Sequence, residues 1–289
     1  MKKLIVLVMA IAIGLASYFY FSRPHQSTEK IVQQPLVKTN KATITTHYVK
    51  RGKYALYTKV YLPAVRAKLP FVIICPGYSA SYKDYEIIAK KLSKAGIGAA
   101  VFDFVGGNLH SASGGKMSAM SPSSEEKDLT ALIRYFMKQG YCDQHHFYLA
   151  GHSQGGLIAS LVAAKRKDIR SLFLCAPAYN IPDMVKLVAV PKKGKTMRVG
   201  NGEVGRQYIQ GMKAIKMYKD VKAYTKPVYI FHGTVDLTVP ISYSWDAKEA
   251  YKNCHVYPYA DEWHVFSHEA ISKMCKKVIH VINKQKTEK

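Results

Sequence analysis

Five short runs of consecutive apolar residues, separated by segments of helical periodicity, constrain the fold of this chain more than any other feature. Continuous rather than alternating apolar residues indicate strands covered on both faces, as in a mainly parallel sheet. The expected strands lie at residues 71–75, 98–104, 147–151, 171–177 and 227–233. The expected helices lie at residues 82–95, 123–139, 154–165, 241–251 and 267–283. This alternation predicts an α/β fold with a twisted sheet and helices on both faces.

Two segments depart from the alternation. Residues 42–62 alternate apolar and polar side chains on either side of Arg51-Gly52, which predicts an antiparallel N-terminal hairpin. Residues 178–224 separate two strands by far more than one helix needs, and they are basic and contain several glycines. Long insertions of this kind are usually functional, and we expect a small lid. Its apolar residues could form the wall of a substrate pocket: Val188, Val190, Met197, Ile209 and Met212.

The first 22 residues have the composition of a membrane-inserting segment. Lys2 and Lys3 precede an apolar run from Leu4 to Phe21, whose length as a helix would be about 27 Å. A signal peptide cleaved near Ala16 fits as well, but the aromatic end of the run favours an uncleaved anchor. We therefore expect the N-terminal segment to contact a membrane and the folded domain to be anchored outside the cytoplasm, or else secreted.

The expected domain organisation follows from these boundaries. Residues 1–22 are the anchor or signal peptide, residues 23–42 are a polar linker, and residues 43–286 form one α/β domain with the insertion 178–224. About 250 residues are enough for one large domain with a substantial core.

The stretch GHSQGG at 151–156 lies between the end of an expected strand and the start of an expected helix. Ser153 is then at the apex of a sharp turn, where its hydroxyl projects from the sheet. Gly151 and Gly155 are small because side chains there would collide with the neighbouring strand or helix. The Gly-x-Ser-x-Gly pattern in this context predicts a serine nucleophile.

A nucleophilic serine needs a base and a group that orients the base. In this architecture the acid follows the serine and the histidine comes last, an order that Asp236 and His264 satisfy. Both follow strands, at the edge where such sites are built. We expect His264 to take the proton of Ser153, and Asp236 to hold the ring. The backbone N–H groups of Gln154 and Tyr78 are the expected oxyanion donors.

Other acids fit the orienting role less well. Asp220 and Asp246 lie in expected helices. Asp261 and Glu262 are so close to His264 in sequence that neither should reach the far ring nitrogen.

Three other histidines fit the role of the base less well. His232 precedes a glycine and is expected to pack or hydrogen-bond at a strand end. His268 should lie inside the following helix. His152 flanks the nucleophile, but its side chain is expected to point away from the site.

These motifs resemble the α/β-hydrolase superfamily over residues 50–284. GHSQGG, HGTVDLTVP and the final H-x-F are similar to the cinnamoyl/feruloyl esterase-like group, next to the monoacylglycerol-lipase-like and serine-aminopeptidase-like hydrolases. The resemblance implies an α/β-hydrolase fold and a lid that contacts the acyl part of the substrate. Residues 101–115 resemble the segment after the fourth strand of these esterases. Pro76-Gly77 stands where they commonly have His-Gly; the backbone should still supply the oxyanion hole, but the substrate preference of these esterases does not carry over to this chain.

Composition narrows the functional classes. The net charge is +24, but the basic residues are scattered and no nucleic-acid motif appears, so we expect a solvated lysine-rich surface and no specific nucleic-acid site. The five cysteines lack metal-ligand spacing, so buried thiols are expected and one disulfide stays open. With no phosphate loop and no dinucleotide fingerprint, neither cofactor nor metal is implied.

The leading interpretation is a serine hydrolase that cleaves a small-molecule carboxylic ester through an acyl-enzyme. A peptidase or amidase with the same three residues is the alternative. A non-catalytic binding protein of the same fold is disfavoured, because such proteins usually lose one of the three residues. The oligomeric state does not follow from the sequence.

Overall fold

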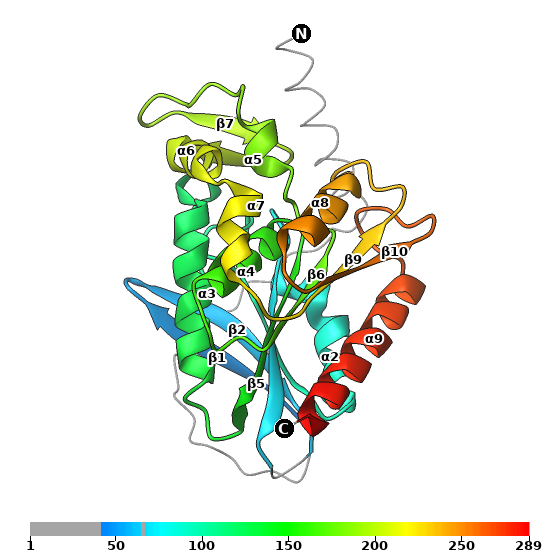
Figure 1. Cartoon of the computed structure of the whole chain (residues 1–289). Helices are drawn as coiled ribbons and strands as arrows, with labels where there is room; N and C mark the ends of the chain where they lie inside the picture. The colour runs from blue at the N-terminus through cyan, green and yellow to red at the C-terminus, as the bar shows by residue number, and fades with distance from the viewer. Residues whose placement is uncertain (1–41, 65–66, 289) are drawn as a thin grey trace.

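In the computed structural model, which describes residues 42–64 and 67–288, eight strands build one sheet in the order β1-β2-β4-β3-β5-β6-β9-β10 (Figure 1). The strands are β1 (Thr43–Arg51), β2 (Tyr54–Leu62), β3 (Leu69–Cys75), β4 (Gly98–Phe102), β5 (Cys142–His152), β6 (Ser171–Cys175), β9 (Val228–Gly233) and β10 (Cys254–Tyr259). β2 runs antiparallel to β1 and β4, and the other neighbouring pairs are parallel. The expected fold class, a mainly parallel α/β sheet with an N-terminal hairpin, is confirmed.

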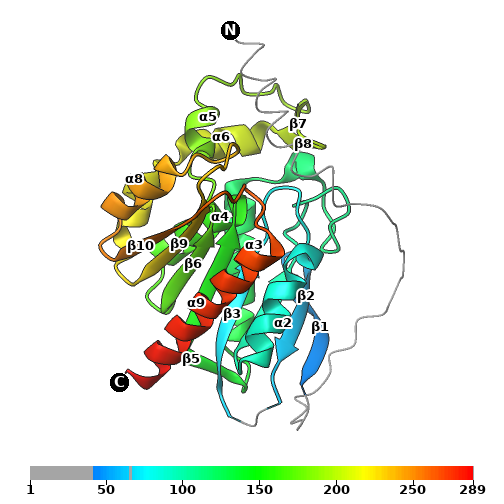
Figure 2. The ribbon, with the colours of Figure 1, turned by 90° about the vertical axis from the view of Figure 1, so that its right-hand side faces the viewer.

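Helices cover both faces of the sheet (Figures 1 and 2). One face carries α3 (Pro122–Phe136), α4 (Gln154–Ala164) and α8 (Ser242–Ala250). The opposite face carries α2 (Glu86–Lys94), which follows the short helix η1 (Tyr82–Tyr85), and α9 (His268–Thr287). α2 and α9 lie side by side in both views. Each expected helix is therefore present, with its ends shifted by a few residues.

The edge strand β10 is the short strand expected before His264, although it is not one of the five continuous apolar runs. Four of its side chains are half-buried and two are exposed, because an edge strand of this sheet is covered less completely than a central one. It also contains Pro258, a residue tolerated chiefly at sheet edges. In the hairpin, Arg51 pairs with Tyr54, so the two-residue turn is Gly52-Lys53 rather than Arg51-Gly52, and Gly52 adopts a φ of 58°.

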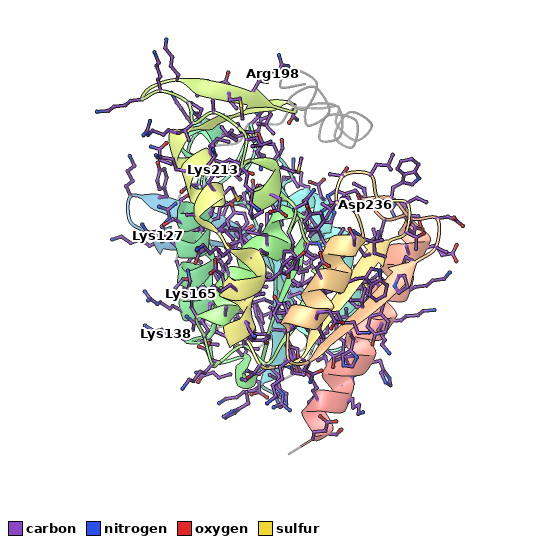
Figure 3. The ribbon with its side chains drawn as sticks, turned by 45° about the horizontal axis from the view of Figure 1, so that its top comes forward. Lys127, Lys138, Lys165, Arg198, Lys213 and Asp236 are labelled. Atoms are coloured by element: carbon purple, nitrogen blue, oxygen red, sulfur yellow. The ribbon has the colours of Figure 1, made fainter. Side chains whose placement is uncertain are left out.

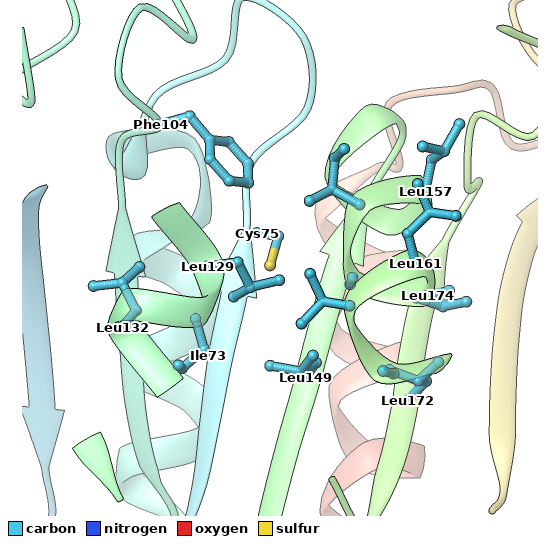
Figure 4. Close-up of a cluster of buried hydrophobic side chains, with 14 of the residues drawn as sticks. Ile73, Cys75, Phe104, Leu129, Leu132, Leu149, Leu157, Leu161, Leu172 and Leu174 are labelled. Carbon is cyan, nitrogen blue, oxygen red and sulfur yellow. The ribbon is translucent and has the colours of Figure 1, made fainter. Parts of the chain in front are cut away.

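The main core lies between the central strands and the helices α3 and α4. Figure 4 shows side chains from β3, β5 and β6 meeting side chains from the two helices. The labelled aliphatic members of this cluster are Ile73, Leu129, Leu132, Leu149, Leu157, Leu161, Leu172 and Leu174. The continuous apolar strand runs arise because a second core, beneath α2 and α9, covers the other face.

The insertion between β6 and β9 rises above the carboxyl ends of the strands (Figure 1). It contains the helices α5 (Ile181–Met184), α6 (Arg206–Ala214), α7 (Met217–Asp220) and η3 (Val221–Ala223), and a two-stranded sheet of β7 (Thr196–Val199) and β8 (Gly202–Gly205). β8 packs against η2 (Met117–Ala119), where Gly202 faces the side chain of Met117. The insertion is therefore held to the loop before α3 as well as by its two ends.

The basic surface is made of exposed side chains. Lys127, Lys138 and Lys165 extend from the α3–α4 side, and Arg198 and Lys213 extend from the insertion (Figure 3). All five cysteines are free thiols, and Cys75, Cys142 and Cys275 are buried.

The expected localisation, membrane-anchored with the domain outside the cytoplasm or secreted, is corrected here. Across residues 42–64 and 67–288, no helix combines the length and the apolar character needed to cross a bilayer. α9 has 20 residues, but five of them are lysines and it packs on the sheet through one face. The segment 1–22, on which that expectation was based, lies outside the described residues.

Candidate active site

Ser153 lies at the turn between β5 and α4, with φ 53° and ψ −125°. A non-glycine residue in this region is strained, and the surrounding structure must hold it there. A Cβ atom on Gly155 would overlap the carbonyl oxygens of Cys75 and Pro76, and one on Gly151 would overlap the backbone of Gly155. The two glycines therefore allow α4 to approach the sheet closely enough to form the turn.

Ser153, His264 and Asp236 form a continuous chain of hydrogen bonds. Oγ of Ser153 lies 2.9 Å from Nε2 of His264, and Nδ1 of His264 lies 2.7 Å from Oδ2 of Asp236. Each residue follows a strand, namely β5, β10 and β9, whose carboxyl ends meet at one edge of the sheet. Parallel strand order thus brings together side chains that are up to 111 positions apart in the chain.

The surroundings of Asp236 favour its ionised form. Burial by itself would raise the pKa of Asp236, but hydrogen bonds from His232 and His264 and from the N–H of Val239 hold that pKa well below its ordinary value. Oδ1 also accepts the N–H of Thr238 at 2.8 Å. An ionised Asp236 favours the proton of His264 on Nδ1, which leaves Nε2 free to accept a proton from Ser153.

The competing histidines occupy other positions. His232 is buried at the end of β9, with Nε2 2.8 Å from the carbonyl oxygen of Val239 and Nδ1 2.6 Å from Oγ of Ser244. Because a carbonyl oxygen only accepts, Nε2 of His232 carries the proton, and it lies 3.3 Å from Oδ2 of Asp236. His268 is the first residue of α9. His232 therefore supports Asp236 rather than replacing His264.

The competing acids are also engaged elsewhere. Asp220 and Asp246 lie in α7 and α8, as expected. Asp261 is exposed, and its N–H donates to Oγ1 of Thr234. The carboxylate of Glu262 accepts from Ser267 at the start of α9. Each of these hydrogen bonds stabilises a loop or helix end beside the site.

Two backbone N–H groups lie close to Ser153 without a hydrogen-bond acceptor of their own in the part of the chain that the structure describes. Gln154 is the first residue of α4, so its N–H has no acceptor within the helix. Among the described residues, the N–H of Tyr78 has no hydrogen-bond acceptor either. A Cβ atom on Gly77 would lie 3.2 Å from Cβ of Ser153, so this loop passes directly beside the serine. The N–H of Ser79 donates to the carbonyl of Gly107, which ties the loop to the glycine-rich segment after β4.

The side chain of His152 was expected to point away from the site. It does not contact Ser153 through a hydrogen bond, but it does contact the backbone of His264. It leaves the turn toward α2, yet its Nε2 lies 2.9 Å from the carbonyl oxygen of His264 and its Nδ1 lies 3.0 Å from the hydroxyl of Tyr85. Sequence reasoning missed Tyr85 altogether, because it lies in η1, far from the three motifs.

A second buried network lies beneath Gln154. Its Nε2 donates to Oε2 of Glu125 at 2.8 Å, and its Oε1 accepts from the hydroxyl of Tyr208 at 2.6 Å. Burial raises the pKa of Glu125 well above its ordinary value, and the hydrogen bond from Gln154 opposes that rise only in part. The network joins α3, α4 and the insertion helix α6. No motif marks Glu125 in the sequence, since it reads as an ordinary acid in the first turn of a helix.

A cavity of about 300 Å³ opens at Ser153 and His264. Most of its wall is apolar, and the insertion contributes nine residues of it: Ala178, Asn180, Ile181, Met184, Val185, Met197, Val199, Tyr208 and Ile209. Of the five residues expected to form an apolar wall, Met197 and Ile209 line the cavity, whereas Val188, Val190 and Met212 do not. Within residues 42–64 and 67–288, no group of three histidine, cysteine, aspartate or glutamate side chains is placed to share a metal ion.

Known proteins provide an independent comparison. Residues 67–199 match a family model described as serine aminopeptidase, S33. A structure of Est1E from Butyrivibrio proteoclasticus with bound ferulic acid is 25% identical, covers 83% of this chain and 99% of its own, and has a TM-score of 0.76. The monoacylglycerol lipase of Paleococcus ferrophilus is 18% identical, covers 78% of this chain and 98% of its own, and has a TM-score of 0.63. No curated protein matches the chain.

The raised pKa of Glu125 predicts a specific pH dependence of stability. Its folded-state pKa is raised, so the folded protein keeps a proton that the unfolded chain loses above about pH 4.3. The free energy of unfolding should therefore fall as pH rises, by up to about 1.4 kcal/mol per pH unit for this one group. In Glu125→Gln this loss disappears, so the variant should gain stability relative to wild type between pH 5 and pH 8, as measured by urea unfolding.

The matched control for this experiment is Glu126→Gln, which removes a charge from the same turn of α3 at a half-buried carboxylate that pairs with Lys165. If the difference between Glu125→Gln and wild type stays constant over the pH range, the carboxyl is not held neutral in the folded protein.

Proposed function

We propose that this chain, which belongs to the α/β-hydrolase superfamily, is a serine hydrolase that cleaves small-molecule carboxylic esters through an acyl-enzyme. The coarser description, an esterase- or lipase-like or related hydrolase, is supported by the matched family model and the structural neighbours. We further propose that residues 43–286 form the catalytic domain and that residues 178–224 are its lid.

One observation carries the proposal: the hydroxyl of Ser153 lies 2.9 Å from a histidine that is itself held by a buried carboxylate. His264 takes the proton of Ser153 as Oγ attacks the substrate carbonyl carbon, and the resulting imidazolium is stabilised by Asp236. The N–H groups of Tyr78 and Gln154 stabilise the negative charge on the carbonyl oxygen.

His264 then donates its proton to the leaving alcohol, and the acyl group stays on Ser153. In the second half of the reaction His264 takes a proton from water as the water oxygen attacks the acyl carbon. The bond from that carbon to Oγ of Ser153 then breaks, His264 returns the proton to Oγ, and the acid is released. No step needs a cofactor or metal.

Hydrolysis of an amide or peptide is the second candidate, and the match to the serine aminopeptidase model favours it. An aminopeptidase must also bind the ammonium group of its substrate. Asp84 is the only aspartate or glutamate of the described residues that lines the cavity, and its carboxylate accepts the N–H of Ser81 at the start of η1. The apolar wall suits an ester better. Rates measured on p-nitrophenyl esters, a feruloyl ester, a monoacylglycerol and an aminoacyl amide would decide between the two.

The nucleophile provides the direct test. Ser153→Ala should fold normally, should not react with a fluorophosphonate probe, and should lose about 10³-fold or more of the activity on p-nitrophenyl butyrate. Ser123→Ala, on the exposed side of α3, is the control and should behave like wild type. Normal labelling of folded Ser153→Ala would reject the mechanism.

The identity of the acid can be tested by a pair of isosteric changes. Asp236→Asn should lower kcat by about 10⁴, because the amide cannot hold the required tautomer of His264. Asp261→Asn removes an exposed carboxylate three residues before His264 and should leave kcat within about twofold. If the two variants show the opposite result, the acid has been assigned to the wrong residue.

The lid should select the acyl chain through the residues that reach the cavity. Met197→Ala shortens a cavity wall and should lower kcat/KM for octanoyl relative to acetyl esters by about tenfold, since lost methylene contacts reduce binding of the longer chain. Val190→Ala, a half-buried lid residue outside the cavity wall, is the control. An unchanged preference across acetyl, butyryl, octanoyl and feruloyl esters in Met197→Ala would leave the lid without this role.

A further inference from the structure

A chain of buried hydrogen bonds links the two loops that the proposed reaction needs. The backbone nitrogen of Gly77 lies 3.0 Å from the hydroxyl oxygen of Tyr85, and that oxygen lies 3.0 Å from Nδ1 of His152. On the other side of the ring, Nε2 of His152 lies 2.9 Å from the carbonyl oxygen of His264. One end of the chain is thus the residue before Tyr78, and the other end is His264 itself.

The groups at the two ends of this hydrogen-bond chain determine which atom donates and which accepts in each bond. The carbonyl oxygen of His264 can only accept, so Nε2 of His152 carries the ring proton and Nδ1 is an acceptor. The N–H of Gly77 can only donate, so the hydroxyl of Tyr85 accepts from it and donates its own proton to Nδ1. Every donor finds an acceptor when His152 is neutral.

We propose that His152 and Tyr85 are positioning residues that hold the Tyr78 N–H and the His264 ring in register with Ser153. This inference rests on the proposed function. Tyr85 holds the oxyanion loop through Gly77, where an added Cβ atom would make tight contacts with Cβ of Ser153 and Nδ1 of His152. His152 holds the backbone of His264, and the two imidazole rings lie with their centroids 4.8 Å apart.

The geometry of β5 explains how two consecutive residues can have different roles, with Ser153 at the turn and His152 beneath it. Successive residues of β5 point to opposite faces of the sheet, so His152 projects toward the α2 side while the next residue turns upward at the elbow. Tyr85 ends η1 and is buried on that same side. His152 is therefore the side chain nearest the nucleophile that can reach both loops from beneath.

This chain of hydrogen bonds stays intact near neutral pH, because His152 stays uncharged there. Burial, and after it the neighbouring His264, lowers the pKa of His152 to about 3, an effect opposed by its hydrogen bond to the His264 carbonyl and by Asp236. The other titratable groups that face it are Tyr85 and His232. If His152 were protonated, the N–H on its Nδ1 would face the hydroxyl proton of Tyr85. Only the neutral ring can therefore accept the hydrogen bond from Tyr85.

The test removes each hydrogen bond and then restores it. Tyr85→Phe and His152→Leu should each lower kcat by about 10- to 100-fold while KM stays within about threefold, because displacement of the donor and the base affects the transition state rather than substrate binding. His152→Gln keeps one donor and one acceptor and should recover most of the loss. In the double variant Tyr85→Phe/His152→Leu, the loss should be close to that of one single variant, since both act through one chain.

Tyr148→Phe is the matched control. This tyrosine is buried on the same side of the sheet, and its hydroxyl has no hydrogen-bond partner among the described residues, so its removal should leave kcat unchanged. Unfolding temperatures and fluorophosphonate labelling rates are measured for every variant, and kinetics are compared well below the lowest unfolding temperature.

Wild-type kcat in folded Tyr85→Phe, or in folded His152→Leu, would overturn the proposal. Loss of folding in both would assign the chain a purely structural role and would overturn it too. If only His152→Leu fails to fold, the kcat of the near-isosteric variant Tyr85→Phe decides whether the proposal stands. The Ser153→Ala result separates these outcomes from failure of the proposed function: normal labelling there rejects both, whereas lost labelling with unaffected Tyr85→Phe rejects only the positioning role.

Discussion

The close approach of α4 to the sheet is the constraint on which the rest of the site depends. Gly155 packs against the backbone at the end of β3, and Gly151 packs against Gly155, so a single added methyl group would push the helix away. This contact maintains the strained backbone of Ser153 and places the N-terminal end of α4 directly after it. It also brings the loop containing Gly77 beside the serine, because that loop begins where β3 ends.

Buried polar groups around this contact are satisfied in two hydrogen-bond networks, which connect other elements of the fold to the site. Glu125 and Tyr208 hold the side chain of Gln154 between α3 and the insertion. Asp236 is held by backbone N–H groups on one side and by two histidines on the other. Such networks are costly when one member is lost, so they favour one arrangement of the site over its alternatives.

The sheet and the meeting of Ser153, Asp236 and His264 at one edge of it could be anticipated because their signals are local. Continuous apolar runs identify central strands, and glycines around Ser153 identify a turn, whatever the rest of the chain does. The edge strand β10 escaped this criterion because it is covered less completely than the central strands. The expected localisation was wrong because it extended a pattern in residues 1–22 to the whole protein, whereas no helix of the described residues could span a membrane.

The sequence by itself determined the order of strands and helices, the position of the sharp turn and the chain order of Ser153, Asp236 and His264. Only the tertiary structure decided which other side chains form hydrogen bonds with the residues around this site. Glu125, Tyr85 and His152 derive their contacts from elements that meet in space across tens of residues, and a buried polar group has no periodicity or spacing of its own. Their partners are fixed by packing, which depends on the whole chain being folded.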